Sequence, residues 1–242
     1  MIEWNNKLEQ LYRSKTSDLL KMYEELKQAD RTDYSWPLLL HVWEEEYSNA
    51  PVKLMIIGQE TNGWGAKLET TNDVLSSMKM YEDFNLGHNY KSTFWQWAYK
   101  INQILGNPDS NCFVWNNILK FGKECSKGCP DWQVTNLENK YFNIIADEIS
   151  ILEPDVCIFL TGPSYDAEIK SKFPDVELIN FGDYKINEVS QLKSKKLPAL
   201  SFRTYHPGYG GRYSDWYLEL FEIIANAVKR TAEEELISDR LK

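Results

Sequence analysis

The chain has 242 residues, and 43% of them are hydrophobic, which is enough for a substantial core in one large domain or two small ones. The formal net charge is −9, which argues against a general nucleic-acid binder with a basic surface but leaves a locally basic groove open. The sequence has no run of about 18 apolar residues, and its first residues lack the basic and apolar regions of a signal peptide. We therefore expect a cytoplasmic protein that does not span a membrane.

The N-terminal part predicts helices. Residues 3–28 carry an intermittent apolar stripe between charged positions, which is typical of an amphipathic helix. A second, shorter helix is expected after Pro37, because proline is well tolerated in a first helical turn. These two helices would cover one edge or face of the sheet.

Four short apolar runs predict buried strands. They lie at 52–57, 112–115, 156–160 and 199–202. The segments between and after them predict helices at 92–105, 136–152 and 214–234, a short helix around 73–81 and an edge strand at 176–181. Ser164 is expected to cap the helix that follows the third strand.

Strands separated by helices predict a parallel sheet with right-handed crossovers. The expected fold is a three-layer α/β/α domain with a four-stranded parallel core sheet. No Pro/Gly/Ser-rich linker divides the chain. We expect an N-terminal helical extension at 1–50, the α/β domain at 51–235 and a polar tail at 236–242, in a monomer.

Polar residues follow each predicted strand, and the carboxyl ends of parallel strands gather at one sheet edge, where ligands bind. They are Gln59 and Glu60, Asn116, Thr161 and Ser164, and His206.

A carboxylate, an amide and a histidine around one crevice suit binding followed by hydrolysis. Glu60 could hold or deprotonate a water molecule. Asn116 offers a donor and an acceptor side by side, the pattern that reads the edge of a base. His206 could donate to an oxygen that becomes anionic. Each residue also has a purely structural interpretation: a helix N-terminal acid, a strand-end turn residue and a turn histidine.

The four cysteines predict a reduced chain without a disulfide framework. Cys125 and Cys129 have the wrong spacing for a metal half-site, and no second pair accompanies them. We expect no metal and no cofactor.

The motifs at the strand ends resemble those of the uracil-DNA glycosylase superfamily over about residues 50–230. The first strand ends in Gly-Gln-Glu at 58–60 and the second in Val-Trp-Asn at 114–116. The third enters a Gly-Pro-Ser turn at 162–164, and the fourth ends in Tyr-His-Pro at 205–207.

This resemblance implies a DNA N-glycosylase that extrudes its target nucleotide and reads the base in a pocket. Glu60 would activate water, Gln59 would offer its backbone N–H to the base, Asn116 would read its edge, and His206 would stabilise the departing base. Either Trp64 or Phe84 would stack on the base. The DNA-contacting loops would include Ser164 and, at the wedge position, Tyr209 or Arg212.

The chain departs from the superfamily pattern in three places. Glu60 replaces a shorter Asp or Asn, Thr61-Asn62 replaces Pro-Tyr, and Gly-Tyr-Gly-Gly follows the His-Pro pair at 208–211. The pocket would then admit a larger or different base. Two alternatives stay open: a protein of this fold that binds nucleic acid or a nucleotide without cleaving it, and an N-glycosidase acting on a small nucleoside or nucleotide.

Overall fold

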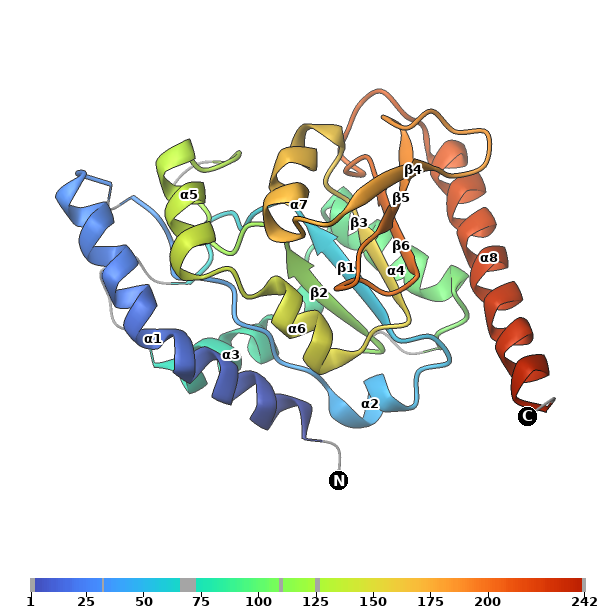
Figure 1. Ribbon diagram of the computed structural model, residues 1–242, viewed down its shortest axis with the longest axis horizontal. Coiled ribbons are helices and arrows are strands. Elements are labelled where there is room, and N and C mark those ends of the chain that lie inside the picture. Colours follow the sequence, from blue (N-terminus) through green and yellow to red (C-terminus); the bar gives the residue numbers. More distant parts are fainter. Residues whose placement is uncertain (1–2, 32, 66–72, 109–110, 125–126, 241–242) are drawn as a thin grey trace.

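The computed structural model describes residues 3–31, 33–65, 73–108, 111–124 and 127–240, with side chains up to residue 234. A six-stranded sheet lies at its centre in the order β2-β1-β3-β6-β5-β4 (Figure 1). The strands are β1 (Leu54–Gly58), β2 (Phe113–Asn117), β3 (Val156–Phe159), β4 (Glu177–Asn180), β5 (Val189–Lys193) and β6 (Leu200–Thr204). The first four in this order are parallel, and β5 and β4 pair antiparallel.

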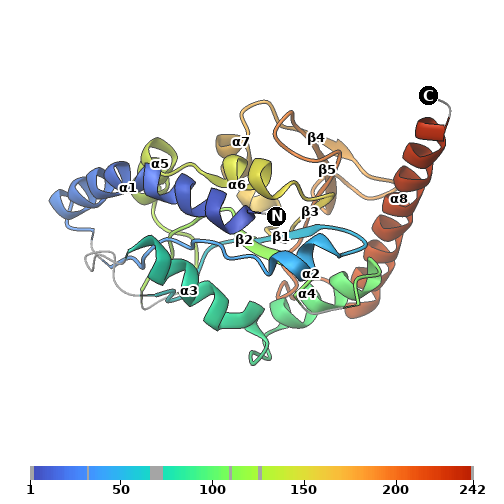
Figure 2. The same ribbon diagram turned by 90° about the horizontal axis from the view of Figure 1, so that it is seen from below.

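Helices lie on both sides of this mixed sheet (Figure 2). On one side are α5 (Trp132–Tyr141), α6 (Ile145–Leu152) and α7 (Asp166–Lys172), and on the other are α2 (Glu44–Ser48), α3 (Val74–Phe84) and α4 (Thr93–Ile104). The long helix α1 (Trp4–Gln28) contacts α5, α6 and α3, and α8 (Ser214–Arg240) contacts α4. Two single 3-10 turns, η1 (Asn85–Gly87) and η2 (Pro163–Tyr165), complete the elements of the described ranges.

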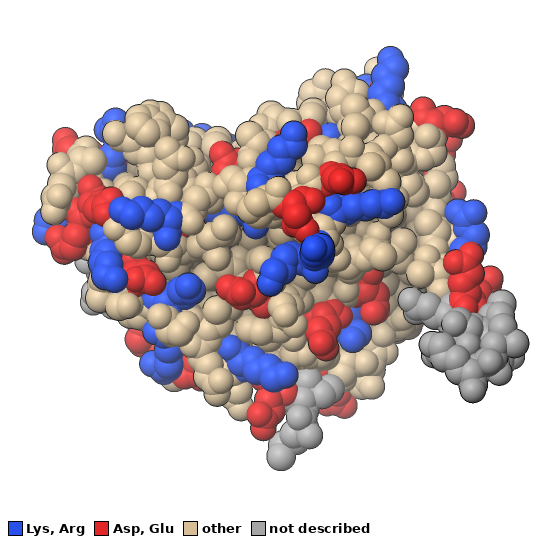
Figure 3. Space-filling view, viewed as in Figure 1, with Lys and Arg blue, Asp and Glu red and all other residues tan. Residues whose placement is uncertain are grey.

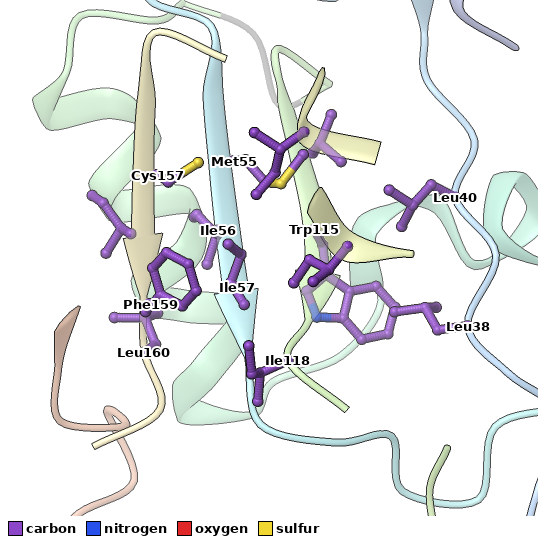
Figure 4. Close-up of a cluster of buried hydrophobic side chains, with 14 of the residues drawn as sticks. Leu38, Leu40, Met55, Ile56, Ile57, Trp115, Ile118, Cys157, Phe159 and Leu160 are labelled. Atoms are coloured by element: carbon purple, nitrogen blue, oxygen red, sulfur yellow. The ribbon is translucent and has the colours of Figure 1, made fainter. Parts of the chain in front are cut away.

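The core lies between the parallel strands and these helices. Every residue of β1, β2 and β3 is buried, as expected for strands covered on both faces. Figure 4 shows side chains of the three strands packed side by side, with the segment that carries Leu38 and Leu40 beside them. The buried side chains of α1 belong to the same hydrophobic cluster as those of the sheet.

Residues 37–43 are not the helix that the sequence predicts. This segment is not helical, and the next helix, α2, begins only at Glu44. The backbone N–H of Leu38 donates to the carbonyl of Lys120 (2.9 Å), and that of Leu40 donates to the Tyr12 hydroxyl (3.0 Å). Bonds to distant segments replace those of a helix, and the leucines at 38–40 are all buried.

Three further boundaries differ from the prediction. The predicted helix 136–152 is two helices, α5 and α6, because the chain turns where Phe142 and Ile144 are both buried. The predicted four-stranded sheet gains β5, whose polar sequence Val-Ser-Gln-Leu-Lys gave no strand signal. The last helix continues to Arg240, through most of the predicted polar tail. The helices at 3–28, 73–81 and 92–105 and the edge strand at 176–181 are confirmed.

Candidate functional site

A pocket of about 1000 Å³ opens at the carboxyl ends of β1 and β2. Its walls come from several parts of the chain: residues 58–65 at and after the end of β1, the end of α3, the start of α4, the end of β2, the segment with Lys127 and Gly128, η2 with Tyr165, and the loop with His206. The site therefore lies where ligands bind in open α/β sheets. Residues 66–72, which follow the part of this wall at 58–65, are outside the described residues.

The segment after β1 is held in place by the segment after β2. The backbone N–H of Leu119 donates to the carbonyl of Gln59 (3.0 Å), and that of Gly63 donates to the carbonyl of Lys123 (3.2 Å). The Gln59 side chain donates to the carbonyl of Thr161 (2.8 Å), which ties it to the end of β3. Gln59 lines the pocket as predicted. The role of its backbone N–H stays a prediction.

Glu60 lines the pocket and is partly buried. Its Oε2 accepts a short hydrogen bond from the Tyr165 hydroxyl. Burial raises the pKa of the Glu60 carboxyl above its usual value, against the opposing effects of the Tyr165 hydrogen bond, the Lys123 charge and the Gly128 backbone N–H. A raised pKa makes the ionised carboxylate of Glu60 a stronger base than that of an exposed glutamate.

His206 lies in the same pocket lining, with its ring parallel to that of Phe94 (5.6 Å between centroids, 17° between planes). Its Nδ1 accepts a hydrogen bond from the backbone N–H of Gly208 (3.0 Å). An accepting Nδ1 leaves the proton of the neutral ring on Nε2. Burial lowers the pKa of His206, so the ring is neutral at pH 7 and offers Nε2–H as a donor.

The assignment of Asn116 as the base-reading amide is wrong. Asn116 is fully buried on the other face of β2, where its Nδ2 donates to Glu148 (2.9 Å) and its Oδ1 accepts from Lys120 (2.5 Å). Successive side chains of a strand point to opposite faces. The amide that lines the pocket belongs to Asn117, the last residue of β2.

Asn117 is held against the pocket floor. Its Oδ1 accepts a hydrogen bond from the indole Nε1 of Trp115 (3.2 Å), and its Nδ2 has no partner among the described residues. Gly58 is the residue opposite Asn117 in the sheet. A Cβ built on Gly58 would overlap the Asn117 side chain, so only glycine leaves room for this amide.

Aromatic rings form much of the lining. Trp64 and Phe84 are both present, as predicted, and their rings contact each other edge to face at 5.2 Å. The sequence interpretation missed five further aromatic residues of the lining: Tyr90, Phe94, Trp95, Trp115 and Tyr165. Nothing in the helical periodicity of residues 92–105 marks Phe94, in the first turn of α4, as part of a pocket wall.

The three residues expected to contact DNA do not line this pocket. Ser164 is exposed in η2 and does not cap α7, which begins at Asp166 without a side-chain cap. Tyr209 is exposed and stacks on Tyr205 (4.6 Å between centroids). Arg212 forms an ion pair with Glu188. The proposed wedge roles stay untested.

The lysines that follow β2 differ in their surroundings. Lys120 is buried, and its ammonium group lies against Glu148 (2.6 Å). Lys127 lines the pocket, and the positive charge of Lys123 lowers the pKa of Glu60. Among the residues that the structure describes, no group of three His, Cys, Asp or Glu side chains is placed to hold a metal ion. Cys125 is outside those residues, so the cysteine pair is not placed.

Comparison with known proteins leaves the family open. The sequence matches no protein-family model, and a search of curated proteins finds no match. In the described part of the chain, no helix combines the length and apolar character that a membrane crossing requires.

Proposed function

We propose that this protein is an N-glycosidase that hydrolyses the bond between a modified base and its sugar, with the base presented from DNA. The observation that carries the proposal is the meeting of Glu60, Asn117 and His206 in one aromatic pocket at the carboxyl edge of the sheet. The resemblance of the strand-end motifs to the uracil-DNA glycosylase superfamily agrees with this chemistry, with Asn117 in place of Asn116.

In the proposed reaction, the aromatic rings stack on the base and exclude water from its faces. Glu60 accepts a proton from the water that attacks the sugar C1′. The C1′–N bond breaks, and its electron pair moves onto the base. The Nε2–H of neutral His206 donates to the base oxygen that becomes negative, a form of stabilisation that needs no rearrangement when the donor is already oriented. Phe94 orients the ring from one face.

A free nucleoside or nucleotide is the second candidate substrate. The charged residues of the pocket lining include Glu60 and Asp83 with Lys127, which is not a basic surface for a phosphate backbone. The face over α1, α5, α6 and β4 carries basic and acidic side chains interspersed (Figure 3). These observations and the net charge of −9 argue against an extended contact with duplex DNA, which keeps a small substrate as the second candidate.

The test is a strand-cleavage assay with labelled single- and double-stranded oligonucleotides that carry uracil, hypoxanthine or xanthine, followed by alkali, and with the free nucleosides in parallel. We expect Glu60→Gln and His206→Ala each to lower the rate by about 10²- to 10⁴-fold. His88→Ala is the matched control, because His88 is exposed and does not line the pocket. Absence of cleavage of every oligonucleotide and nucleoside by the wild-type protein would refute the proposal.

A further inference from the structure

Two buried donors in the pocket lining have no acceptor. The Nδ2 of Asn117 and the indole Nε1 of Trp64 lack a hydrogen-bond partner among the described residues, and the two side chains are only 2% and 8% exposed. A buried polar group without a partner loses the hydrogen bonds that it makes to water in the unfolded chain and is therefore destabilising. Both residues line the same pocket, so a ligand is the natural source of the missing acceptors.

The two donors belong to one wall. The ring of Trp64 lies 5.3 Å from that of Trp115, and the indole N–H of Trp115 holds the oxygen end of the Asn117 amide. This bond fixes the orientation of the amide, so Asn117 turns its donor end and not its acceptor end to a ligand. This wall therefore presents two hydrogen-bond donors, and a ligand that satisfies them has to present two acceptors.

The charged groups of the lining do not add up to an anion site. Glu60 and Asp83 contribute carboxylates to the pocket, Asp83 is paired with Lys79, and Lys127 contributes a single ammonium group. Neutral carbonyl oxygens or ring nitrogens on a flat ligand therefore suit the two donors and the aromatic walls better than a phosphate or carboxylate.

The pocket is larger than a one-ring base requires. A volume of about 1000 Å³ is at the upper end of the range for small-molecule sites, about 300–1000 Å³, and has room for a two-ring base with its sugar. Among the bases, guanine-type purines present two neighbouring acceptors, O6 and N7, on one edge. Adenine presents a donor next to N7, and a pyrimidine such as thymine presents one carbonyl next to a carbon atom.

We propose that the pocket selects a 6-oxopurine base, with Asn117 Nδ2 and Trp64 Nε1 donating to its O6 and N7 acceptors. The inference rests on the proposed function for its setting, a base held in this pocket, but it concerns binding and not cleavage. Asn117 and Trp64 are its specificity-determining residues.

The test is isothermal titration calorimetry of the wild-type protein with four free bases: hypoxanthine, 7-deazahypoxanthine, adenine and uracil. We expect hypoxanthine to bind roughly threefold to tenfold more tightly than 7-deazahypoxanthine, which lacks only the N7 acceptor. Its preference over adenine and over uracil should be at least as large. Equal affinity for hypoxanthine and its 7-deaza analogue, or tighter binding of uracil, would overturn the proposal.

Two variants locate the donors. Trp64→Phe keeps a ring but removes Nε1–H, and Asn117→Ala removes the amide; one of the two is expected to bind hypoxanthine and 7-deazahypoxanthine equally. Trp132→Phe is the matched control, since Trp132 is 71% exposed and outside the pocket. If both pocket variants keep the full preference for hypoxanthine, the donors are assigned wrongly. The ligand series on the wild-type protein stays decisive if a variant does not fold.

The same measurements separate this inference from the proposed function. Tight binding of hypoxanthine without cleavage of any oligonucleotide or nucleoside would support the 6-oxopurine site and refute the glycosidase. Cleavage of uracil-containing DNA without binding of hypoxanthine would keep the glycosidase and overturn the 6-oxopurine site.

Discussion

Glu60 combines two requirements that oppose each other at the scale of a single residue. A general base has to be ionised when it acts, yet burial of Glu60 favours its neutral form and raises its pKa above the ordinary value of 4.5. The Tyr165 hydroxyl offsets part of this cost by donating to the carboxylate. In the proposed reaction, Tyr165 is therefore a positioning residue that acts through Glu60.

This conflict predicts a pH-dependent gain in stability for Glu60→Gln. Because the folded-state pKa is raised, the favourable contribution of the protonated carboxyl is complete below pH 4.5 and is lost as the pH rises through the folded-state pKa. The wild-type protein should therefore lose stability relative to the variant as the pH rises above 4.5. Urea unfolding of both proteins between pH 4 and pH 8 measures the difference.

The exposed Glu45 provides the control for this measurement. Glu45→Gln on α2 should change the free energy of unfolding by less than about 0.5 kcal/mol at every pH.

Tyr165→Phe removes a hydrogen bond that lowers the pKa of Glu60, so the acid limb of the pH–rate profile should move to higher pH. An unchanged acid limb would show that Tyr165 does not act through Glu60.

The choice between Asn116 and Asn117 is also decided at the residue scale. The sequence predicts an amide at the end of the second strand, but two asparagines stand there in succession. A shift of one residue along a strand moves a side chain to the opposite face of the sheet. Only packing decides, because Glu148 and Lys120 occupy one face and the aromatic wall occupies the other.

At the scale of elements, the exit from β1 depends on its contact with the chain after β2. A Cβ built on Gly122 would overlap the backbone carbonyl of Thr61, so the two segments pass each other as closely as glycine allows. A bridge between Asn62 and Lys123 continues this pairing. The pocket wall at residues 59–63 is therefore braced by residues 119–123, which do not themselves line the pocket.

This contact predicts that Gly122→Ala destabilises the protein by about 1–3 kcal/mol, the usual cost of forcing extra volume into a packed site. Activity and ligand affinity should fall together with stability, because the added Cβ displaces Thr61, the residue next to Glu60. Thermal unfolding and the cleavage assay measure the two effects. Gly210→Ala is the control, because a Cβ at Gly210 meets nothing within 4 Å. Equal stability of the two variants would contradict the bracing role.

Helices with a polar and an apolar face could be predicted from the sequence. Segments whose conformation depends on contacts with other segments could not. The stripe of α1 lies within one segment, so local periodicity suffices. Residues 37–43 and β5 take their conformation from contacts with other segments: Leu38 bonds to Lys120, which is distant in sequence, and β5 pairs with the neighbouring strands β4 and β6. Local propensity is a weak guide where tertiary contacts override it.

At the scale of the whole molecule, the acidic balance predicts weak contact with a phosphate backbone. At physiological salt we expect an affinity for unmodified duplex DNA no tighter than about 10⁻⁶ M. The plot of log affinity against log salt should have a slope smaller in magnitude than about 3, which corresponds to few neutralised phosphates. Fluorescence anisotropy with a labelled duplex at several salt concentrations measures both, and a slope near −6 would reveal a basic groove.

The sequence by itself determined the α/β class, the parallel strands and the edge of the sheet where polar residues gather. These follow from short-range patterns: apolar runs, glycine turns and helical periodicity. The tertiary structure alone decided which asparagine faces the pocket, that Lys120 is buried, that α5 and α6 are separate and that seven aromatic rings line one cavity. Those outcomes depend on which surfaces meet across the fold, and pairing between distant segments leaves no periodic signal in either of them.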